Sequence, residues 1–584
     1  MKELLSLNKL IYKYKWLLFW GAIFVIATNF ISVYAIRYIG KAINLIDDAF
    51  SKTGEPAGVK QLLIYGSIII VLPIISGILT FFQRQTIIVA SRHIEFDLKN
   101  VIYQHYQELD TSFYKKNRTG DLMNRISEDV GYVRMYLGPG IMYPINLISL
   151  AIILIVEMLF INKTLTLYTL APLPILSVLI YFISSIINRK SREVQEEQSN
   201  LSSYVQDIFS GIRVIKSFNK EEQIKTAYAQ NANNYKRKSI SLANIQAFFF
   251  PMMLLVIGIS QILILYAGGA AYINGEIEEI GTVAQFFMYL NMLIWPFASL
   301  GWISMVVQRA EASMKRINEF LKATPSVVNT VTEHTPIEGA ISFKDVSFTY
   351  ENTGIKALSN ITFDLPAGKT LAILGKTGSG KTTLAELIAR LYDPTEGVVL
   401  MDGKPLEELN LNDLRTQIGF VPQEAFLFSE TLASNIAFAA DDASREDIIK
   451  FAKKADVHHN IIEFQEGYDT KVGERGVTLS GGQKQRISIA RALIKDPRIL
   501  IFDDSLSAVD TETEENILQN IQEVAKQKTI VIITHRVSSA KHADKIIVLR
   551  EGRIAQEGTH ESLLEQGGEY KELYEMQLNE DGNN

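Results

Sequence analysis

Six long apolar stretches constrain the fold of this chain more than any other feature of its sequence. A helix needs about 20 mostly apolar residues to cross a bilayer, and each stretch is long enough. A helix buried in a soluble protein can also be apolar on all sides, but six such stretches in one half of a chain exclude a soluble fold. The sequence predicts an all-α six-helix membrane domain over residues 1–310, with spans near residues 16–39, 61–82, 139–161, 164–187, 246–273 and 280–306.

The cationic residues around these spans predict their orientation. Several lysines precede the first span, and arginines or lysines follow the second, fourth and sixth spans. In contrast, residues 274–280 (NGEIEEI), between the fifth and sixth spans, are acidic. Cytoplasmic loops carry an excess of lysine and arginine. We therefore expect a multi-pass protein of the cytoplasmic membrane, with its N-terminus, its C-terminus and everything after residue 310 in the cytoplasm.

Two cytoplasmic connections are long and have a helical pattern: one joins spans two and three, the other spans four and five. Each is interrupted near its middle, at residues 112–120 (SFYKKNRTG) and 210–219 (SGIRVIKSFN). Because a helix rises about 1.5 Å per residue, such helices project well beyond the bilayer. We expect a short segment at each tip that docks on the downstream domain and transmits its movement. A plain helical hairpin ending in solvent is the alternative.

Two features inside the spans allow a functional and a structural interpretation. Glu157 is the clear carboxylate within a span, and it either attracts cationic substrates or reaches the lipid headgroups. The aromatic and methionine side chains either line an adaptable cavity for apolar, planar molecules or face lipid. These side chains are Phe248, Phe249, Phe250, Met252, Met253, Phe287, Met288, Trp295, Phe297 and Trp302.

Residues 374–383, LGKTGSGKTT, lie between an apolar segment and a helical pattern, and they match the phosphate-loop template G-x-x-x-x-G-K-[ST]. Glycines let the backbone wrap around phosphates, and its N–H groups form an anion cradle with the helix N-terminus. The lysine reaches the β- and γ-phosphates, and the hydroxyl after it can ligate Mg²⁺. The loop predicts a nucleoside triphosphate site formed by Gly375, Lys376, Thr377, Gly378, Ser379, Gly380, Lys381, Thr382 and Thr383.

After a linker over residues 311–340, residues 341–584 have the pattern of a soluble α/β domain. Tyr350 ends a strand with alternating apolar residues and can stack on adenine, which is worth roughly 1–3 kcal/mol per base. A half-buried strand residue is the alternative. Asp503 ends the hydrophobic strand RILIFDDS, where a carboxylate can bind Mg²⁺ together with Thr382.

Two further polar residues are candidates for the same site. His535 ends the strand TIVIITH and is predicted to sense or hold the γ-phosphate; a simple strand-end histidine is the alternative. Gln423, in VPQEAFLF, is predicted to contact Mg²⁺ and the attacking water.

A second anion-binding helix start follows, because LSGGQ precedes the amphipathic pattern KQRISIARALI. One nucleotide needs only one phosphate loop. A second anion-binding segment is explained if two such domains meet head to tail, so that the LSGGQ segment of each domain covers the γ-phosphate bound by the other domain. The residues of this segment are Leu479, Ser480, Gly481, Gly482 and Gln483.

Together these motifs resemble a bacterial ABC exporter half-transporter over nearly the whole chain. The resemblance implies a domain-swapped six-helix membrane domain, followed by an α/β P-loop ATP-binding cassette with a helical subdomain. It also implies a dimer whose coupling helices correspond to residues 113–118 and 212–218. The matching motifs are the A-loop Tyr350, the Walker A loop 375–382, the Q-loop Gln423, the X-loop 470–476 (TKVGERG), the signature 479–483, the Walker B strand 499–503, the D-loop from Ser507 to Asp510 and the switch His535.

Asp504 departs from the family pattern, in which a glutamate follows the Walker B aspartate and polarises the attacking water. Aspartate is one methylene shorter, which withdraws its charge by about 1.5 Å. General-base help is typically worth about 10²–10⁴-fold and depends on reach. With Asp504, Gln423 and His535 as catalytic residues, we predict a site that binds ATP and Mg²⁺ but hydrolyses ATP slowly. The alternative is that the substitution is tolerated, because a shifted backbone brings the Asp504 carboxylate back to the attacking water.

Asp504 beside an intact LSGGQ resembles one subunit of the heterodimeric multidrug exporters. The expected function is ATP-driven export of hydrophobic or amphipathic small molecules across the bilayer by a heterodimer of half-transporters, although a homodimer is possible. A lipid flippase and an ATP-gated channel or regulator are the alternatives. The net charge of −6 argues against a nucleic-acid partner. The chain has no cysteine, which excludes disulfides and thiolate metal sites.

Overall fold

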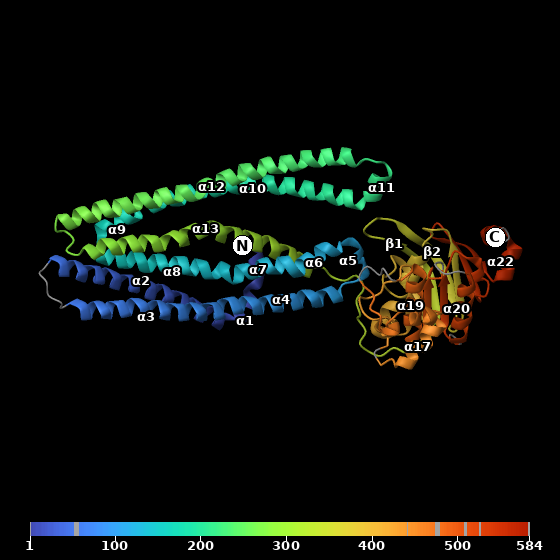
Figure 1. The fold of residues 1–584 in the computed structure, drawn as a ribbon. Helices are drawn as coiled ribbons and strands as arrows, with labels where there is room; N and C mark the ends of the chain where they lie inside the picture. Colours follow the sequence, from blue (N-terminus) through green and yellow to red (C-terminus); the bar gives the residue numbers. More distant parts are fainter. Residues whose placement is uncertain are drawn as a thin grey trace. The chain divides into compact units, whose positions relative to one another are not determined.

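The computed structural model describes residues 2–51, 58–440, 442–473, 479–506, 511–524 and 527–581. The chain forms two compact units (Figure 1). Unit 1 contains Met1–Gln107 and Gly120–Ala323, and unit 2 contains Glu108–Thr119 and Thr324–Asn584. The short segment Glu108–Thr119 therefore packs with the C-terminal part of the chain.

Unit 1 is built of long helices that lie side by side (Figure 1). Its apolar stretches form helices because a helix satisfies every backbone hydrogen bond within one segment. The helices are η1 Glu3–Leu7, α1 Asn8–Lys13, α2 Lys15–Ser51, α3 Val59–Gln83, η3 Arg84–Ile88, α4 Val89–Glu108, α6 Thr119–Asn124, η4 Arg125–Asp129, α7 Val130–Leu137, α8 Pro139–Ile161, α9 Lys163–Leu170, α10 Pro172–Ser210, α11 Ile212–Ser217, α12 Glu221–Ile273 and α13 Ile280–Leu321.

The six segments predicted as spans lie in α2, α3, α8, α9 with α10, α12 and α13. Among the described residues, four helical stretches are long and apolar enough to cross a membrane: Lys15–Asp48, Val59–Glu108, Thr119–Ile161 and Glu221–Ile273. The segment 164–187 is not one helix, because α9 ends at Leu170 and α10 begins at Pro172. Proline lacks an N–H and therefore suits the first turn of a new helix. Helix α13 also runs to Leu321, past the predicted linker start at residue 311.

Glycines bring α2 and α13 close together. A Cβ on Gly40 would lie 1.8 Å from the Gln285 amide nitrogen, and one on Gly281 would lie 2.2 Å from the Gly40 carbonyl oxygen. Small residues let helix backbones approach in membrane domains. The Gly281 N–H donates to Asn44 Oδ1 at 2.6 Å, which fixes the register of the two helices.

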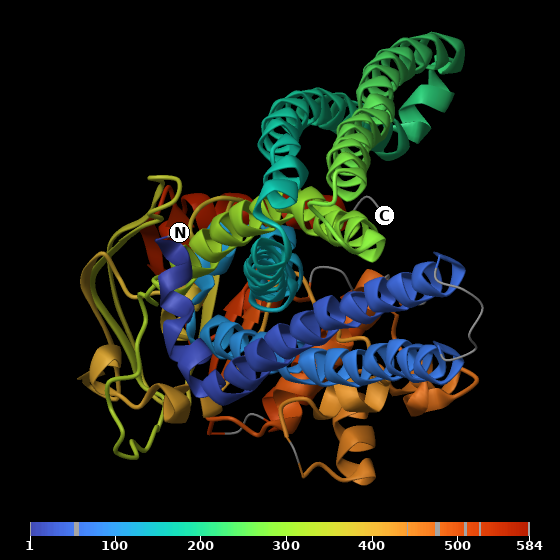
Figure 2. The ribbon, with the colours of Figure 1, turned by 90° about the vertical axis from the view of Figure 1, so that its left-hand side faces the viewer.

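Helices α10 and α12 run side by side to the tip helix α11, and Figure 2 shows this pair extending away from the other helices of unit 1. The tip carries apolar side chains in contact with solvent: Val214 is 61% exposed and Phe218 is 70% exposed. The interruption predicted at residues 210–219 is therefore a short helix with an apolar surface.

Unit 2 contains two sheets. In the larger sheet, ordered β10-β9-β3-β8-β7-β6, all strands are parallel except β10. The smaller sheet, ordered β2-β1-β4-β5, is antiparallel. The strands are β1 Ile341–Thr349, β2 Lys356–Leu365, β3 Thr370–Gly375, β4 Glu396–Met401, β5 Lys404–Pro405, β6 Ile418–Val421, β7 Ile499–Asp503, β8 Thr529–Ile533, β9 Lys545–Arg550 and β10 Arg553–Gly558.

Helices cover these sheets, and α16 to α19, the region of the predicted helical subdomain, pack around a hydrophobic cluster that they share with β6, β7, β8 and α20. The helices of unit 2 are α5 Thr111–Lys116, α14 Lys381–Ile388, η5 Leu406–Glu408, α15 Leu411–Thr416, α16 Leu432–Ala437, α17 Arg445–Lys454, α18 His458–Ile462, η6 Gly467–Asp469, α19 Gly481–Ile494, α20 Thr511–Val524, α21 Val537–Ala540, α22 His560–Gln566 and α23 Glu569–Asp581.

The register of the parallel strands determines what meets at the carboxyl edge of the larger sheet. Val421 of β6 pairs with Phe502, and Asp503 of β7 pairs with Ile533 at the end of β8. Strand β3 pairs with β8 through Ile373, just before the phosphate loop. Because parallel strands end at one edge, the segments that follow β3, β6, β7 and β8 converge there.

Candidate nucleotide site

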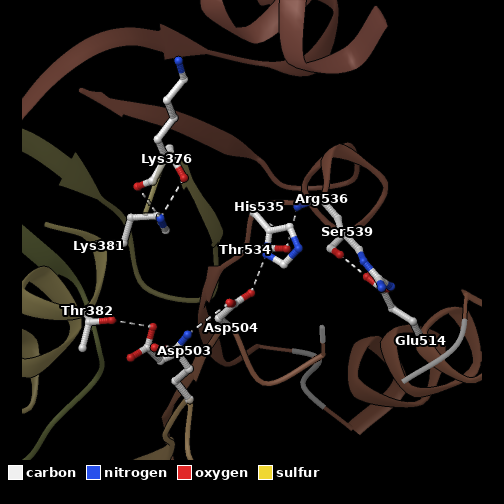
Figure 3. A network of polar contacts seen from close by, with 12 residues as sticks. Lys376, Lys381, Thr382, Asp503, Asp504, Glu514, Thr534, His535, Arg536 and Ser539 are labelled. Atoms are coloured by element: carbon white, nitrogen blue, oxygen red, sulfur yellow. Dashed lines mark hydrogen bonds and ion pairs between the residues drawn. The ribbon is translucent and has the colours of Figure 1, made fainter. Parts of the chain in front are cut away.

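The phosphate loop joins β3 to α14 and depends on glycine at its turn. Gly378 and Gly380 have φ angles of 82° and 100°, which side chains with a Cβ rarely adopt. A Cβ on Gly380 would also lie 2.5 Å from the Ala357 carbonyl oxygen. The Lys381 ammonium donates to the carbonyl oxygens of Gly375 at 2.7 Å and Lys376 at 3.0 Å (Figure 3). Burial lowers the pKa of Lys381. A phosphate bound nearby would counter this effect, because an opposite charge favours the charged form of a lysine.

Thr382 and Asp503 form the predicted pair of magnesium ligands. The Thr382 hydroxyl donates to Asp503 Oδ1 at 3.1 Å (Figure 3). Asp503 is buried at the end of β7, and burial raises the pKa of its carboxyl to about 6. A hydroxyl and a carboxylate that meet beside a phosphate loop are oxygen ligands of the type that Mg²⁺ prefers. The residues therefore fit the metal, which would neutralise phosphate charge there.

Asp504 contacts both other predicted catalytic residues, and Figure 3 shows its contact with one of them, His535. His535 Nδ1 is 2.9 Å from Asp504 Oδ1, and the Gln423 amide donates to Asp504 Oδ2 at 3.4 Å. The Asp504 backbone has a φ of 45°, and its N–H donates to the Ile533 carbonyl at 2.9 Å. Gln423 after β6 and His535 after β8 thus both contact the carboxylate of Asp504, which follows β7 at the carboxyl edge of the sheet.

Tyr350 directly follows β1, and its hydroxyl is tied to the first turns of α14. It lies 2.9 Å from the Thr383 hydroxyl and donates to Glu386 Oε2 at 3.2 Å. The Tyr350 ring also packs edge-on against Phe348, with the ring centroids 4.9 Å apart. The side chain predicted to stack on adenine is therefore linked to the helix that follows the phosphate loop.

Helix α5, the first predicted tip, docks on this part of unit 2. The Lys115 ammonium lies 3.0 Å from Glu386 Oε1 and 5.4 Å from the centroid of the Tyr350 ring. Hydrogen bonds to Tyr392 and Glu386 outweigh the opposing effect of burial and raise the pKa of Lys115. The buried Glu386 carboxylate thus accepts from both Lys115 and Tyr350. The structure places the first tip on the nucleotide domain, as the sequence predicts.

Asp110 explains why α5 spans Thr111–Lys116 and not residues 113–118. Its carboxylate caps the helix by accepting from the Phe113 N–H at 3.1 Å. It also accepts from the Ser326 N–H and, at 3.2 Å, from the Val327 N–H of the chain that leads to β1. Asp110 is not among the residues predicted from the sequence; an aspartate just before a helix is a local capping signal, whereas the bonds to Ser326 and Val327 cross more than 200 residues and have no local signal.

The LSGGQ segment starts α19 as the sequence predicts. Ser480 caps the helix by accepting from the Gln483 N–H at 3.2 Å, and Gln483 Oε1 accepts in return from the Ser480 N–H at 2.9 Å. Among the described residues, no atom lies within 4 Å of the place that a Cβ on Gly481 would take, so none of them covers this helix start at Gly481. The described contacts of Ser480 and Gln483 lie within their own capping box, outside the network around Asp504.

Two of the expected motifs lie wholly or partly outside the described residues. These are the D-loop residues Ser507 and Asp510, and the end of the X-loop 470–476. Within unit 1, Glu157 has a partner in its own chain, because its Oε1 lies 3.7 Å from Arg37 Nη1. The carboxylate that the sequence singles out for attracting cationic substrates is thus already paired with a cation. In the aromatic and methionine group, Phe248 is 70% exposed, whereas Met253 is buried.

The fold and the site together define a class of protein: a helical membrane domain fused to a cassette that binds ATP with Mg²⁺. A family model described as the ABC transporter transmembrane region matches residues 18–297, and one described as ABC transporter matches residues 358–507. The chain belongs to the ABC transporter family.

The relatives extend over nearly the whole chain. The multidrug resistance-like ATP-binding protein MdlA of Escherichia coli (strain K12) is 36% identical over 539 residues, covering 92% of this chain and 91% of that one. An ATP-dependent lipid A-core flippase of Haemophilus influenzae (strain 86-028NP) is 32% identical over 535 residues, covering 91% and 90%. The solved structure of a bacterial Atm1-family ABC exporter with ATP bound has a TM-score of 0.77 and 26% identity, covering 98% of each chain.

These similarities confirm the predicted fold class, a mostly helical membrane domain followed by an α/β cassette. The chain is an ABC exporter half-transporter, an ATPase coupled to transport. Half-transporters of this kind work as dimers in the lipid bilayer, with the ATP-binding domain in the cytoplasm.

Proposed function

We propose that this chain is one half of a heterodimeric exporter of amphipathic or hydrophobic compounds in the cytoplasmic membrane, with both termini in the cytoplasm. Its own Walker site, with Lys381, Thr382 and Asp503, holds MgATP and turns over slowly. Its LSGGQ segment completes the faster site on the partner subunit. The multidrug name of the Escherichia coli relative supports the substrate class.

The position of Asp504 is the single observation that carries the slow-site proposal. The carboxylate is held by Gln423 at 3.4 Å and by His535 at 2.9 Å, so its neighbours are the expected catalytic groups while its side chain is one methylene short. The missing methylene withdraws the charge by about 1.5 Å from a water that a glutamate would reach. A backbone shift could bring the shorter carboxylate back to the attacking water. The hydrogen bond from the Asp504 N–H to the Ile533 carbonyl opposes such a shift, because it ties Asp504 to β8.

Two features support a partner subunit. The open helix start at Gly481 is available to a nucleotide held by another cassette. Val214 of α11 and Phe218, the residue after this helix, are apolar and exposed, and a cassette of the second subunit is the surface that the domain-swapped arrangement would bring to them. A second copy of this chain would satisfy the same two features, so the homodimer is the competing assembly.

A lipid flippase is the second candidate, and the lipid A-core flippase of Haemophilus influenzae favours it. Reconstituted transporter in vesicles distinguishes the substrates. Accumulation of amphipathic dyes against a gradient supports an exporter, and movement of labelled lipids alone supports a flippase. Dye movement that only equilibrates, with no accumulation, would indicate an ATP-gated channel or regulator.

The slow-site proposal predicts that Asp504→Glu activates the chain purified alone. Because a general base contributes about 10²–10⁴-fold, we expect ATP hydrolysis by the Asp504→Glu chain to rise at least about 10-fold. The double variant Asp504→Glu with Lys381→Ala is the control, and it should hydrolyse no ATP because the phosphate loop is damaged. Fast hydrolysis by the unaltered chain, unchanged by Asp504→Glu, would contradict the proposal.

The heterodimer proposal predicts that a second, different half-transporter co-purifies with this chain and that the pair hydrolyses ATP faster than either chain alone. In the pair, Lys381→Ala should leave most turnover intact, whereas Ser480→Arg should abolish it by blocking the partner's site. Equal loss from both changes would instead indicate two equivalent sites.

A further inference from the structure

The last described helix, α23, has one face that packs against the nucleotide domain. Tyr570, Leu573, Tyr574 and Gln577 recur at the spacing i, i+3, i+4 and i+7, which places them on one side of a helix. Tyr570 is fully buried, in a hydrophobic cluster that contains Leu374, the residue before the first glycine of the phosphate loop. Leu573 and Tyr574 pack against the same cluster, so the fourth position, Gln577, is carried to the same surface.

Gln577 contacts the backbone on both sides of Arg536. Its amide nitrogen donates to the His535 carbonyl oxygen at 2.7 Å, and its amide oxygen accepts from the Val537 N–H at 2.7 Å. A primary amide offers a donor and an acceptor side by side. The two bonds therefore hold residues 535–537 as a neighbouring strand would hold them. Val537 is 1% exposed, and its N–H has this partner in place of water.

The Arg536 N–H donates to Thr534 Oγ1 at 3.0 Å, and the remaining side-chain contacts of this segment hold residues after His535. Glu514 of α20 pairs with Arg536 and accepts from the Ser539 hydroxyl (Figure 3). The His535 ring itself is 54% exposed and meets Asp504 through one ring nitrogen. Its direction therefore depends on the backbone at residue 535, and the Gln577 amide is the contact made to the carbonyl of that residue.

We propose that Gln577 is a positioning residue of the ATPase, through which α23 aims the imidazole of His535 at the nucleotide. The proposal rests on the role proposed above for His535. Misplacing a catalytic group by about 1 Å can cost about 10²-fold in rate. Loss of the amide contacts leaves nucleotide binding to the phosphate loop unchanged, so its effect falls on turnover.

The experiment uses the full chain in lipid nanodiscs, in the Asp504→Glu background or in the unaltered chain, whichever turns over faster. Gln577→Leu removes both hydrogen bonds at similar size, and Gln577→Glu keeps the acceptor but removes the donor. Leu578→Ala is the matched control, because the neighbouring Leu578 side chain is 52% exposed on the same helix. Each variant is measured for kcat, for the KM of ATP and for hydrogen exchange of residues 533–540.

We expect Gln577→Leu to lower kcat by about 10-fold or more, within the range that a misplaced group can lose, while KM changes less than about twofold. Gln577→Glu should fall between Gln577→Leu and the unaltered chain, and Leu578→Ala should match the unaltered chain. Hydrogen exchange of residues 533–540 should become faster in Gln577→Leu only. Unchanged exchange would overturn the proposed contact, and faster exchange with unchanged kcat would overturn the positioning role.

The His535→Ala background separates this inference from the proposed catalytic role of His535. If Gln577 acts through His535, adding Gln577→Leu to His535→Ala lowers kcat by less than about twofold. A further 10-fold loss would show that Gln577 acts elsewhere and would overturn the inference. If His535→Ala alone leaves kcat unchanged, the role of His535 fails, whereas faster exchange in Gln577→Leu would still establish the backbone contact.

Discussion

A single buried carboxylate, that of Glu386, joins three parts of the nucleotide domain. It accepts from Lys115 of α5 and from the Tyr350 hydroxyl, and that hydroxyl also meets Thr383 of the phosphate loop. Hydrogen bonds to a charged group are worth about 1.5–3 kcal/mol each. At the scale of residues, Glu386 therefore ties the expected adenine-stacking ring to α5, while the Tyr350 hydroxyl ties that ring to Thr383 of the phosphate loop.

Substitutions at Tyr350 separate the effect of ring stacking from that of the hydrogen bonds that its hydroxyl makes with Thr383 and Glu386. Tyr350→Leu removes the ring, and we expect ATP to bind about 5–150-fold more weakly, since stacking is worth about 1–3 kcal/mol per base. Tyr350→Phe keeps the ring and loses only the hydroxyl, so its affinity should fall less than about 10-fold. Titration with a fluorescent ATP analogue measures both. Equal effects of the two changes would show that the hydroxyl, and not the ring, matters.

Asp110 gives a pH-dependent prediction. Burial opposes its ionisation, but hydrogen bonds from Ser112, Ser326 and the Phe113 backbone outweigh burial and lower the pKa of Asp110 to about 2. A carboxyl with a depressed pKa stabilises the fold above its unfolded pKa of about 3.9, and this contribution disappears as pH falls toward the folded pKa.

Asp110→Asn should therefore lower the midpoint of thermal unfolding of the cassette at pH 7. The difference from the unaltered chain should be constant down to about pH 5 and shrink below about pH 4. Asp121→Asn, at an exposed carboxylate, is the control and should show no such dependence. A difference that persists unchanged at pH 3 would contradict the role given to the ionised carboxylate.

At the scale of elements, α5 is a short helix that is held at its start by the Asp110 bonds to Ser326 and Val327 and near its end by the contact of Lys115 with Glu386. Lys115→Met leaves Glu386 with its charge and without that partner, which is costly for a buried carboxylate. We expect basal ATP hydrolysis to change by less than about threefold while stimulation of hydrolysis by transported compounds is lost. The neighbouring exposed Lys116 provides the control, because Lys116→Met should retain stimulation.

A double-variant cycle tests whether Lys115 acts through Glu386. Adding Glu386→Gln to Lys115→Met removes the unpaired charge and should restore part of the stability lost by Lys115→Met alone. Strictly additive losses would show that the two side chains are not coupled.

The elements that the sequence predicts are those with local signals. The phosphate loop, the strand ends at Asp503 and His535 and the helix start at Ser480 each follow from turn, strand or capping residues within a few positions. The pairings of Lys115 with Glu386 and of Arg37 with Glu157 do not, because they join residues 271 and 120 positions apart without a local pattern. The spacing of Tyr570, Leu573 and Tyr574 is a local helical signal that the predictions did not include, and the polar fourth member of this face, Gln577, carries no local signal of what it contacts.

At the scale of the whole molecule, assembly with a second subunit should cover the tip α11. Because the chain has no cysteine, Val214→Cys introduces a unique thiol at a position that is 61% exposed. We expect its reaction with a maleimide to slow at least about 10-fold in the assembled, ATP-bound pair. Lys225→Cys, on the exposed surface of α12, is the control and should react at the same rate in both states. Equal rates at residue 214 would contradict docking of this tip on the partner.

The order of strands in the larger sheet has a consequence for how the protein is made. Strand β3, which carries the phosphate loop, pairs on one side with β8 and on the other with β9, and both are encoded more than 150 residues later. During synthesis from the N-terminus, β3 therefore leaves the ribosome without either neighbour, as an apolar strand with two open edges. Contacts this distant in sequence form slowly, and unpaired strands promote aggregation. We therefore expect yields of the cassette to depend on chaperones that shield residues 370–375 until β8 and β9 have been translated.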